Sequence, residues 1–346
     1  MSRVPPSAAR SWRAVAVACG AALVLSGCGT ATNNAVPHAT GVPSISISVP
    51  LQTVACTTTD SCLAVGGNGS SVVPSTVGEV RPSNRSWTAL GVPATQSGSF
   101  SSASCWSDGC LIGGSQLTGD LLWAYNATDQ SVVTTAHPIG GEAVGAVSCF
   151  ADFACAVIDT TGASGGSRLS FTNDGGVTWS GPLPMAWAGG AVSALSCSEA
   201  LDCLAATSTP SSQVLVEATH DGGVTWSARN VPSQWTTLTS LTCIQLRCNA
   251  LATTATGSQL VRTHTFGRVW SKIALAHHAS ALACASSTTC IVAGEIDSRT
   301  PWLASLHRAS IVSVALKYVP SPLTDVACGL KVCAAVGAST VVALRP

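Results

Sequence analysis

Charged side chains are few in this chain of 346 residues, since only 9% of them are Asp, Glu, Lys or Arg. Aromatic residues make up 5%, and there are two methionines and two tyrosines. A helix bundle is disfavoured, because the good helix formers other than Ala are scarce. The sequence also has no basic stripe of the kind that a nucleic-acid-binding surface needs. Both protein classes are therefore set aside.

Small and β-branched residues are what the chain has in quantity. Short runs rich in Val, Thr, Ser and Ala alternate with breaks, and the chain holds 32 glycines and 17 prolines. Such runs are typical of strands that tight turns connect. The predicted fold class is therefore all-β.

The first 27 residues have the pattern of an export signal. Three arginines precede an apolar run over 14–25, which is too short to be a comfortable membrane span. The tetrapeptide L-S-G-C at 25–28 resembles the lipobox of bacterial lipoproteins. That resemblance implies cleavage before Cys28, a diacylglyceryl thioether on its sulfur and attachment to the outer face of a membrane. The alternative is an ordinary signal peptide followed by a chance cysteine.

The predicted domain organisation follows from this start. Residues 1–27 are a lipoprotein signal peptide, 28–43 a flexible stalk that is polar and proline-punctuated, and 44–346 a single folded domain. The leader contains three arginines and no acid, so 13 basic residues remain against 16 acidic ones, a formal charge of −3. We expect the protein on the extracytoplasmic face of the cell membrane, held there by its lipid anchor.

The cysteines form the strongest pattern in the chain. Apart from Cys19 in the leader and Cys28, they fall into seven couples with C-x4-C or C-x5-C spacing, and successive couples are 41 to 49 residues apart. A repeat of this period indicates a structural unit that is stacked several times. The couples are Cys56–Cys62, Cys105–Cys110, Cys149–Cys155, Cys197–Cys203, Cys243–Cys248, Cys284–Cys290 and Cys328–Cys333.

Each couple stands between two short β-like runs, which is the arrangement of a tight hairpin. Cysteines on the two stems of such a hairpin can come within reach of a disulfide. An exported protein also meets the oxidising conditions in which these bonds persist. Zinc is the rival interpretation, but structural zinc sites bring such knuckles together in fours. We therefore predict seven disulfides within hairpins, no bound metal and no cofactor.

A nine-residue phrase occurs twice, as TNDGGVTWS at 172–180 and as THDGGVTWS at 219–227. It resembles the Asp-box of the sialidase/BNR-type β-propellers, S/T-x-D-x-G-x-T-W, and residues 263–270 keep only its frame. In that family the box is structural and lies away from the active site. Its Asp can accept backbone N–H bonds, its Gly can take positive φ, and its Trp can pack under the turn. The matching residues are Asp174, Gly176, Thr178, Trp179, Asp221, Gly223, Thr225 and Trp226.

The two repeats together predict a seven-bladed β-propeller with four-stranded blades. In each blade strand A ends at the first cysteine, strand B begins at the second, strand C runs to the Asp-box position, and strand D starts from the Trp. The seventh repeat is too short for a strand D of its own, and the alternating segment SISISVP at 44–50 can supply it. An N-terminal strand would then close the ring and leave no open end.

The resemblance to sialidases raises the question of catalysis. Sialidases use an arginine triad, a Tyr/Glu nucleophile pair and an Asp acid/base, and they carry an R-I-P sequence, which this chain lacks. No other catalytic motif with a recognised spacing appears. We therefore predict no catalytic residue, and a sialidase-like glycoside hydrolase stays the alternative function. The candidates for a retaining carboxylate pair, whose proximity sequence cannot show, are Glu142, Glu217, Glu295 and Asp297.

The chain also resembles the non-catalytic BNR-like propellers that are related to photosystem assembly factors. Those propellers act as protein-binding platforms, so the resemblance implies a binding function. The disulfides and Asp-boxes should stiffen one face of the ring, so the variable loops of the other face are the candidate binding face. We predict a monomeric scaffold that binds an unidentified protein or a cell-envelope glycan and no nucleic acid. The candidate residues on that face are Trp187, Trp235, His277, Glu295, Asp297 and Arg299.

Overall fold

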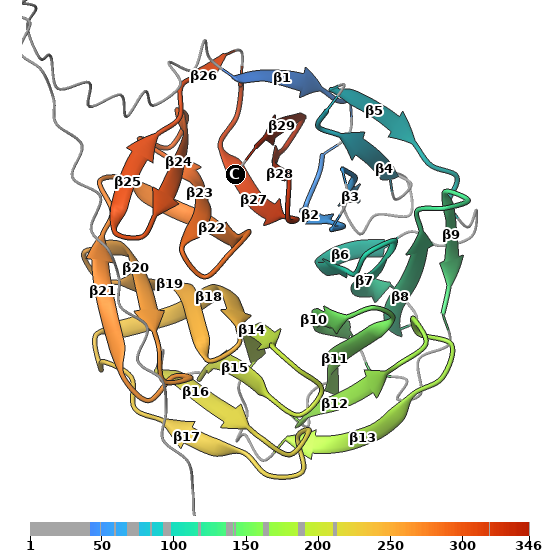
Figure 1. The fold of residues 1–346 in the computed structure, drawn as a ribbon, viewed down its shortest axis with the longest axis vertical. Coiled ribbons are helices and arrows are strands. Elements are labelled where there is room, and N and C mark those ends of the chain that lie inside the picture. The colour runs from blue at the N-terminus through green and yellow to red at the C-terminus, as the bar shows by residue number, and fades with distance from the viewer. Residues whose placement is uncertain are drawn as a thin grey trace, which may run out of the picture. The chain divides into compact units, whose positions relative to one another are not determined.

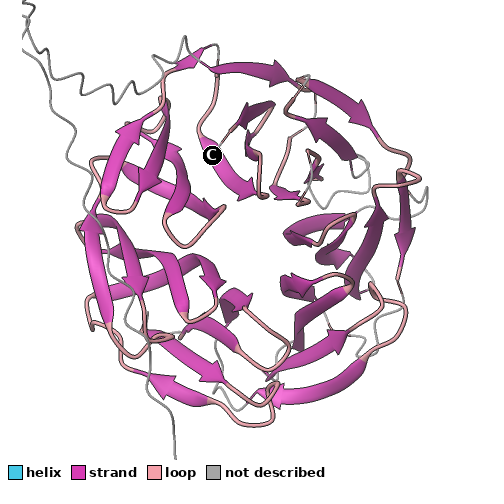
Figure 2. Ribbon diagram, viewed as in Figure 1, coloured by secondary structure: helices cyan, strands magenta, loops and turns pink. Residues whose placement is uncertain are grey.

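The computed structural model describes residues 42–345 except 49, 59, 68–75, 84, 93–97, 117–118, 136–140, 142, 162–165, 186–190, 210–212 and 318. The predicted signal peptide, Cys28 and the stalk up to residue 41 therefore lie outside the described residues. The described part consists of strands and loops (Figure 2). It includes no helix with the length and apolarity needed to cross a bilayer.

The strands form seven sheets that stand around a common axis (Figure 1). Six of them take four consecutive strands each, A to D from the axis outward, and neighbouring strands within each sheet run antiparallel. The short apolar runs of the sequence are these strands, and their turns fall at the Gly, Asn, Asp and Ser clusters between the runs. The predicted seven-bladed β-propeller with four-stranded blades is confirmed.

The blades follow one another in chain order around the ring. The strands of blades 1 to 3 are β2 (Thr53–Cys56), β3 (Cys62–Gly66), β4 (Thr76–Arg81), β5 (Ser86–Ala89), β6 (Gly98–Cys105), β7 (Gly109–Gln116), β8 (Gly119–Asn126), β9 (Ser131–Thr134), β10 (Ala143–Ala151), β11 (Ala154–Thr161), β12 (Gly166–Thr172) and β13 (Ser180–Met185). Those of blades 4 to 6 are β14 (Ala191–Cys197), β15 (Cys203–Ser208), β16 (Val214–Thr219), β17 (Ser227–Arg229), β18 (Trp235–Ile244), β19 (Arg247–Thr254), β20 (Gly257–Thr263), β21 (Trp270–Ala274), β22 (His278–Cys284), β23 (Thr289–Glu295), β24 (Pro301–His307) and β25 (Ser310–Ser313).

Blade 7 closes the ring with strands from both ends of the described chain. Its inner strands are β27 (Leu323–Cys328), β28 (Cys333–Gly337) and β29 (Thr340–Leu344), and β1 (Val42–Ser46) pairs antiparallel with β29 as the fourth strand. The predicted N-terminal closing strand is thus present, although it begins at Val42 and ends at Ser46 rather than covering 44–50. A short strand, β26 (Leu316–Lys317), extends the sheet by parallel pairing with β1, which the sequence did not indicate.

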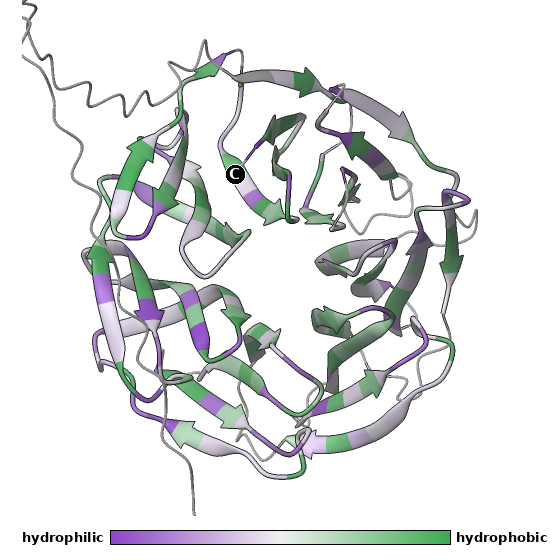
Figure 3. Cartoon of the chain, viewed as in Figure 1, coloured by the Kyte–Doolittle hydropathy of each residue, from purple (hydrophilic) through white to green (hydrophobic). Residues whose placement is uncertain are grey.

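Apolar side chains pack between neighbouring blades rather than in one central core. At the junction of blades 2 and 3, for example, Leu111 and Val157 are fully buried in one cluster. Comparable clusters occupy the other junctions, and Figure 3 shows apolar residues along the strands of every blade. Each such buried side chain stabilises the fold by about 1.5–3 kcal/mol relative to exposure. The ring is therefore held by packing distributed around its whole circumference.

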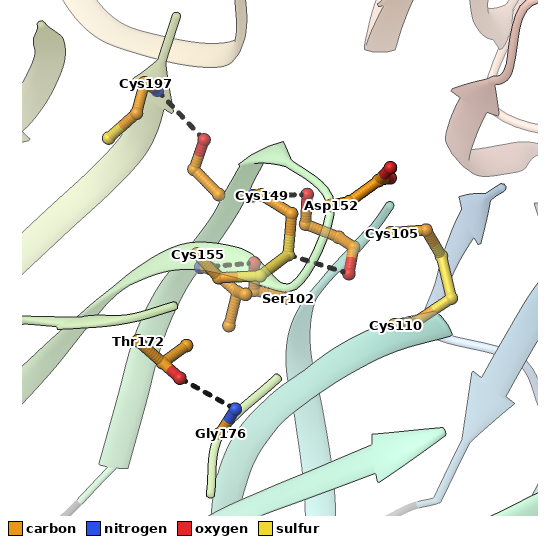
Figure 4. The surroundings of a disulfide bond; sticks show 12 residues. Ser102, Cys105, Cys110, Cys149, Asp152, Cys155, Thr172, Gly176 and Cys197 are labelled. Carbon is orange, nitrogen blue, oxygen red and sulfur yellow. Dashed lines mark hydrogen bonds between the residues drawn. A yellow bond between two sulfur atoms is a disulfide. The ribbon is translucent and has the colours of Figure 1, made fainter. Parts of the chain in front are cut away.

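All seven predicted disulfides are formed, each between strands A and B of one blade. In blade 3, Cys149 is the register partner of Cys155, and their Cα atoms are 4.0 Å apart (Figure 4). Directly opposed residues in an antiparallel ladder have closely spaced Cα atoms. The register of the hairpin alone therefore brings the two sulfurs together. The second cysteine of each pair is fully buried, so the bond also fills the core between blades.

Serine hydroxyls on the inner strands join several pairs of neighbouring blades. Ser104 accepts a hydrogen bond from the backbone N–H of Cys149 at 2.9 Å, and Ser148 accepts one from the N–H of Cys197 at 2.9 Å. Blades 4 and 5 repeat the contact. Small residues suit strand A because the inner strands converge on the axis, and their hydroxyls have this second use. They hydrogen-bond strands that belong to different sheets.

A carboxylate makes the corresponding contact where the ring closes. One oxygen of Asp325 on β27 accepts hydrogen bonds from the Thr53 hydroxyl at 2.7 Å and the Val54 N–H at 2.9 Å, both in blade 1. Its other oxygen accepts the N–H of Val326 at 2.9 Å. Burial raises the pKa of Asp325 above its usual value, while these hydrogen bonds act in the opposite direction. The last blade is thus attached to the first by a carboxylate that accepts two hydrogen bonds from blade 1 and one from its own strand.

Replacing both Cys149 and Cys155 with alanine should lower the free energy of unfolding by about 2 kcal/mol. A disulfide that closes so small a ring removes about that much chain entropy from the unfolded state. Denaturant titration of the variant measures the loss. Peptide mapping without reduction checks the pairing of all seven couples, and a free thiol or a link between blades would contradict it.

Replacing Asp325 with alanine should cost about 1–3 kcal/mol of stability, because the donors of Thr53 and Val54 lose their acceptor. Asp325→Ser should recover part of the loss. The reason is that Ser102 accepts the N–H of Val147 at 2.9 Å in the corresponding contact between blades 2 and 3. Thermal unfolding of the two variants compares them. An alanine variant as stable as the wild type would show that the contact between the blades contributes nothing.

Candidate functional site

The two faces of the ring are built from different connections. The A–B and C–D turns of a blade lie together on one face, where the N–H of Gly175 bonds the carbonyl of Phe153 at 2.9 Å and that of Gly222 bonds Leu201 at 3.1 Å. We call this the disulfide face, because each cysteine pair lies next to its A–B turn. The B–C and D–A loops are at the other end of the strands and form the loop face.

The two Asp-box turns on the disulfide face have the same geometry. In blade 3, Asp174 accepts hydrogen bonds from the N–H of Thr178 at 2.8 Å and from the Thr172 hydroxyl at 2.8 Å. Gly176 has a φ of 97°, and its carbonyl accepts the indole N–H of Trp179 at 3.1 Å. Blade 4 repeats the contacts of the carboxylate around Asp221. The carboxylates thus organise turns, as the sequence led us to expect.

The turn over 264–269 in blade 5 shows what the sequence pattern missed. This segment lacks the Asp, yet the hydroxyl of Thr265 accepts the N–H of Val269 at 2.9 Å in the place of the carboxylate. The hydroxyl of Thr263 accepts the N–H of Gly267 at 3.1 Å, as Thr172 does for Gly176 in blade 3. A hydroxyl one bond shorter than a carboxylate therefore keeps the same turn. The signal in the sequence was the Thr at the Asp position.

Four of the six residues predicted for the binding face come together at blade 6. His277 lies directly before β22, and Glu295, Asp297 and Arg299 lie at or just after the end of β23, so all four are on the loop face. His278 and Glu295 are register partners, with Nδ1 and Oε1 3.8 Å apart. The ring of His277 stacks edge-on against Trp302 at a centroid distance of 5.2 Å. We call His277, Glu295 and the turn over 296–300 the blade 6 corner.

The loop of the blade 6 corner is held in one shape by its own aspartate. Asp297 accepts the N–H groups of Arg299 at 2.9 Å and Thr300 at 2.7 Å, and also the hydroxyl of Thr300 at 3.0 Å. These bonds lower the pKa of Asp297, so the carboxylate is ionised at neutral pH. The turn leaves Arg299 exposed and Ile296 51% exposed. Sequence reasoning missed Ile296, although an isoleucine among polar loop residues was a usable signal.

Of the two tryptophans predicted for the binding face, the structure describes Trp235, which does not support the prediction. Trp235 is only 3% exposed and packs in the core between blades 4 and 5, against the edge of Trp270 at 5.5 Å. As the first residue of β18 it belongs to a strand, and its side chain fills the junction instead of facing solvent. Assigning Trp235 to an exposed face was therefore wrong. Trp187 lies outside the described residues.

The axis of the ring is a channel of about 520 Å³ lined by the inner strands. Its lining consists largely of Ser, Thr, Ala and cysteine residues, with Asp325 as its carboxylate, and among the described residues it includes no arginine. A sialidase-like arginine triad is thus not found in the described lining. The oxygen atoms of Asp325 are occupied by the contacts that close the ring.

The carboxylates considered for a hydrolase are distributed around the ring. Glu217 lies on β16 in blade 4 and Glu295 on β23 in blade 6, with blade 5 between them. Burial raises the pKa of Glu217. Asp297 is committed to its own turn, and Glu142 lies outside the described residues. Within the described ranges, no cluster of three or more His, Cys, Asp or Glu side chains is placed to hold a metal ion.

The stability contributed by Asp221 should depend on pH. Hydrogen bonds from the Thr225 hydroxyl and N–H hold the pKa of Asp221 at about 2, below the usual 3.8. The contribution is therefore complete above pH 4 and is lost as the pH falls through about 2. Asp221→Ala should melt at a lower temperature than the wild type at pH 6, and the gap should close near pH 2. Glu199→Ala, which changes an exposed acid on the same face, is the matched control, and an equal gap at both pH values would contradict the assignment.

No protein-family model matches this chain, and no curated protein was matched either. Solved structures share its fold. "YCF48 bound to D1 peptide" has a TM-score of 0.64 and 14% identity over 88% of this chain and 96% of that one. YCF48 from Cyanidioschyzon merolae has a TM-score of 0.61 and 12% identity over 87% and 97%. A GH74 enzyme from Niastella koreensis has a TM-score of 0.59 and 8% identity over 87% of this chain and 53% of that one. At these identities the likeness shows the β-propeller fold alone.

Proposed function

We propose that this chain is an extracytoplasmic β-propeller, anchored by lipid on Cys28, that binds a protein or a cell-envelope glycan. The export-type leader and the lipobox at 25–28 support the location. The seven disulfides agree with it, because such bonds persist in oxidising compartments. The likeness to YCF48 supports binding of a protein, since one of those structures has a peptide bound.

The observation that carries the proposal is the blade 6 corner on the loop face. Its turn is ordered by Asp297 before any ligand arrives, so binding costs little conformational entropy there. It presents an apolar side chain, Ile296, and a cation, Arg299, together with the half-buried ring of His277, which packs edge-on against the buried Trp302. Arginine is one of the residue types that most often dominate binding energy at interfaces.

The alternative, a sialidase-like glycoside hydrolase, has less support from the geometry. The sequence patterns of the sialidase site are missing, and the candidate carboxylates that the structure describes belong to blades separated in the ring or to turns. The GH74 likeness is one of fold and covers about half of that enzyme. The binding function therefore remains our proposal.

A photo-crosslinking amino acid at position 296 in the full chain should capture the ligand in intact cells. The same residue at Val177, which is 79% exposed on the disulfide face, is the matched control and should capture little. Sensitivity of the adduct to protease or to glycosidases tells a protein from a glycan. Arg299→Ala should reduce capture by about ten-fold, as expected for truncation of an interface arginine. Equal capture at positions 296 and 177 would contradict a ligand site at the blade 6 corner.

A further inference from the structure

Charge is strongly segregated around the ring. Between residues 235 and 345, which form blades 5 to 7, nine Lys and Arg residues stand against three carboxylates. Between residues 28 and 234, four arginines stand against thirteen carboxylates. In a chain with so few charges, this division gives one half of the propeller a positive potential and the other half a negative one. A small net charge conceals it.

Five of the nine cations of blades 5 to 7 are exposed on the disulfide face. The three carboxylates of that stretch lie elsewhere: Glu295 and Asp297 are on the loop face, and Asp325 is in the channel. Exposed cations occupy the A–B turns, the C–D turns and the end of strand C on the disulfide face. They are Arg247, Arg268, Arg308, Lys331 and Arg345.

Exposed apolar side chains accompany these cations. Leu246 is 52% exposed, and Val269 and Leu330 are each 68% exposed. Each of them is the immediate neighbour in sequence of one of the cations, in the pairs Leu246-Arg247, Arg268-Val269 and Leu330-Lys331. We call the eight side chains the basic sector. An apolar tip beside a cation suits the interface of a bilayer, where the tip meets acyl chains and the cation meets headgroup phosphate.

The chain also enters the propeller at this face. β1 runs from Val42 to Ser46, and Ser46 pairs with Thr340, so the Val42 end lies toward Leu344. Leu344 is the register partner of Cys333, which marks the disulfide face of blade 7. Cys28 is fourteen residues before Val42. Fourteen residues can span at most about 50 Å when fully extended.

We propose that the basic sector lies against the surface of an anionic phospholipid bilayer. This inference rests on the lipid anchor at Cys28 that is part of the proposed function. The anchor brings the disulfide face of blade 7 to the membrane, the cations attract anionic headgroups, and the apolar tips enter the interface. The acidic half of the ring is repelled, so the propeller tilts, and the blade 6 corner on the loop face points into the compartment. Each cation should raise the partition onto such a surface by roughly five-fold.

Hydroxyl-radical footprinting of the full lipidated protein tests this placement. The protein is reconstituted in vesicles of phosphatidylglycerol with phosphatidylcholine, and separately in phosphatidylcholine alone. Labelling of Leu246, Val269 and Leu330 should be at least five-fold lower in the anionic vesicles. Ile296 on the loop face and Val177 in the acidic half are internal controls whose labelling should stay the same. Equal labelling of the basic sector in both vesicles overturns the inference. That result is expected if this face binds a protein instead of a bilayer.

Charge reversal provides a second test that keeps the anchor. The triple variant Arg247→Glu, Arg268→Glu, Lys331→Glu changes exposed side chains only, and it should restore labelling of Val269 in anionic vesicles to the level in neutral ones. Arg299→Glu on the loop face is the matched control and should leave the protection intact. Protection that persists in the triple variant would overturn the role of charge.

The mass of the N-terminal peptide reports the lipid on Cys28 independently. If the lipid is absent, the proposed anchoring fails, and the inference about the face is then tested on the unlipidated chain mixed with the same vesicles. Protection of Val269 by anionic vesicles would still support the basic sector as a membrane-facing surface. Equal labelling of that chain with and without vesicles would overturn it.

Discussion

Hydrophobic packing between neighbouring blades is the interaction on which every other feature of this ring depends. A four-stranded sheet has two apolar faces, and a single blade can bury neither alone. In this chain each face finds its partner on the next blade, and β1 completes the last sheet, so that blades 7 and 1 also meet. The inner strands then come close enough for Ser104 and Ser148 to bond the backbone of the following blade. The disulfides add local restraint to hairpins that packing has already aligned.

The same arrangement gives the two faces of the ring different roles. On the disulfide face, Asp174 and Asp221 close turns of fixed shape, and the cysteine pairs restrain the hairpins next to them. On the loop face, the connection after β23 takes its order from Asp297 within a single loop. Loops on a rigid scaffold can vary in sequence without disturbing the core, which is why binding residues concentrate on them. The fold therefore separates the residues that maintain the ring from those free to acquire a ligand.

Repetition is what made the fold predictable from sequence. The spacing of the cysteine couples gave the number of blades, the position of strands A and B and the disulfide pairing, and the short seventh repeat pointed to a closing strand. Properties that depend on neighbours in space were less accessible. Trp235 has polar neighbours in sequence, yet its side chain fills the junction between blades 4 and 5. Which side of a strand end is buried depends on the adjacent blade, and the sequence around Trp235 does not show it. Asp325 had no motif, since its partners Thr53 and Val54 are more than 270 residues away. At the candidate site, the sequence predicted the charged residues near β23 but not Ile296 or the packing of His277 against Trp302.

Ring closure by β1 also sets an order of events for a chain that is made from its N-terminus. The main partner of β1 is β29, the last strand to be made, and the short β26 that also pairs with β1 comes late in the chain as well. Each disulfide, in contrast, joins cysteines only five or six residues apart, so its two halves emerge together. Hairpins can thus become covalently locked one after another while the first strand is still unpaired. The final step is then the docking of β1 onto an almost complete ring, and it requires a chain that extends through β29.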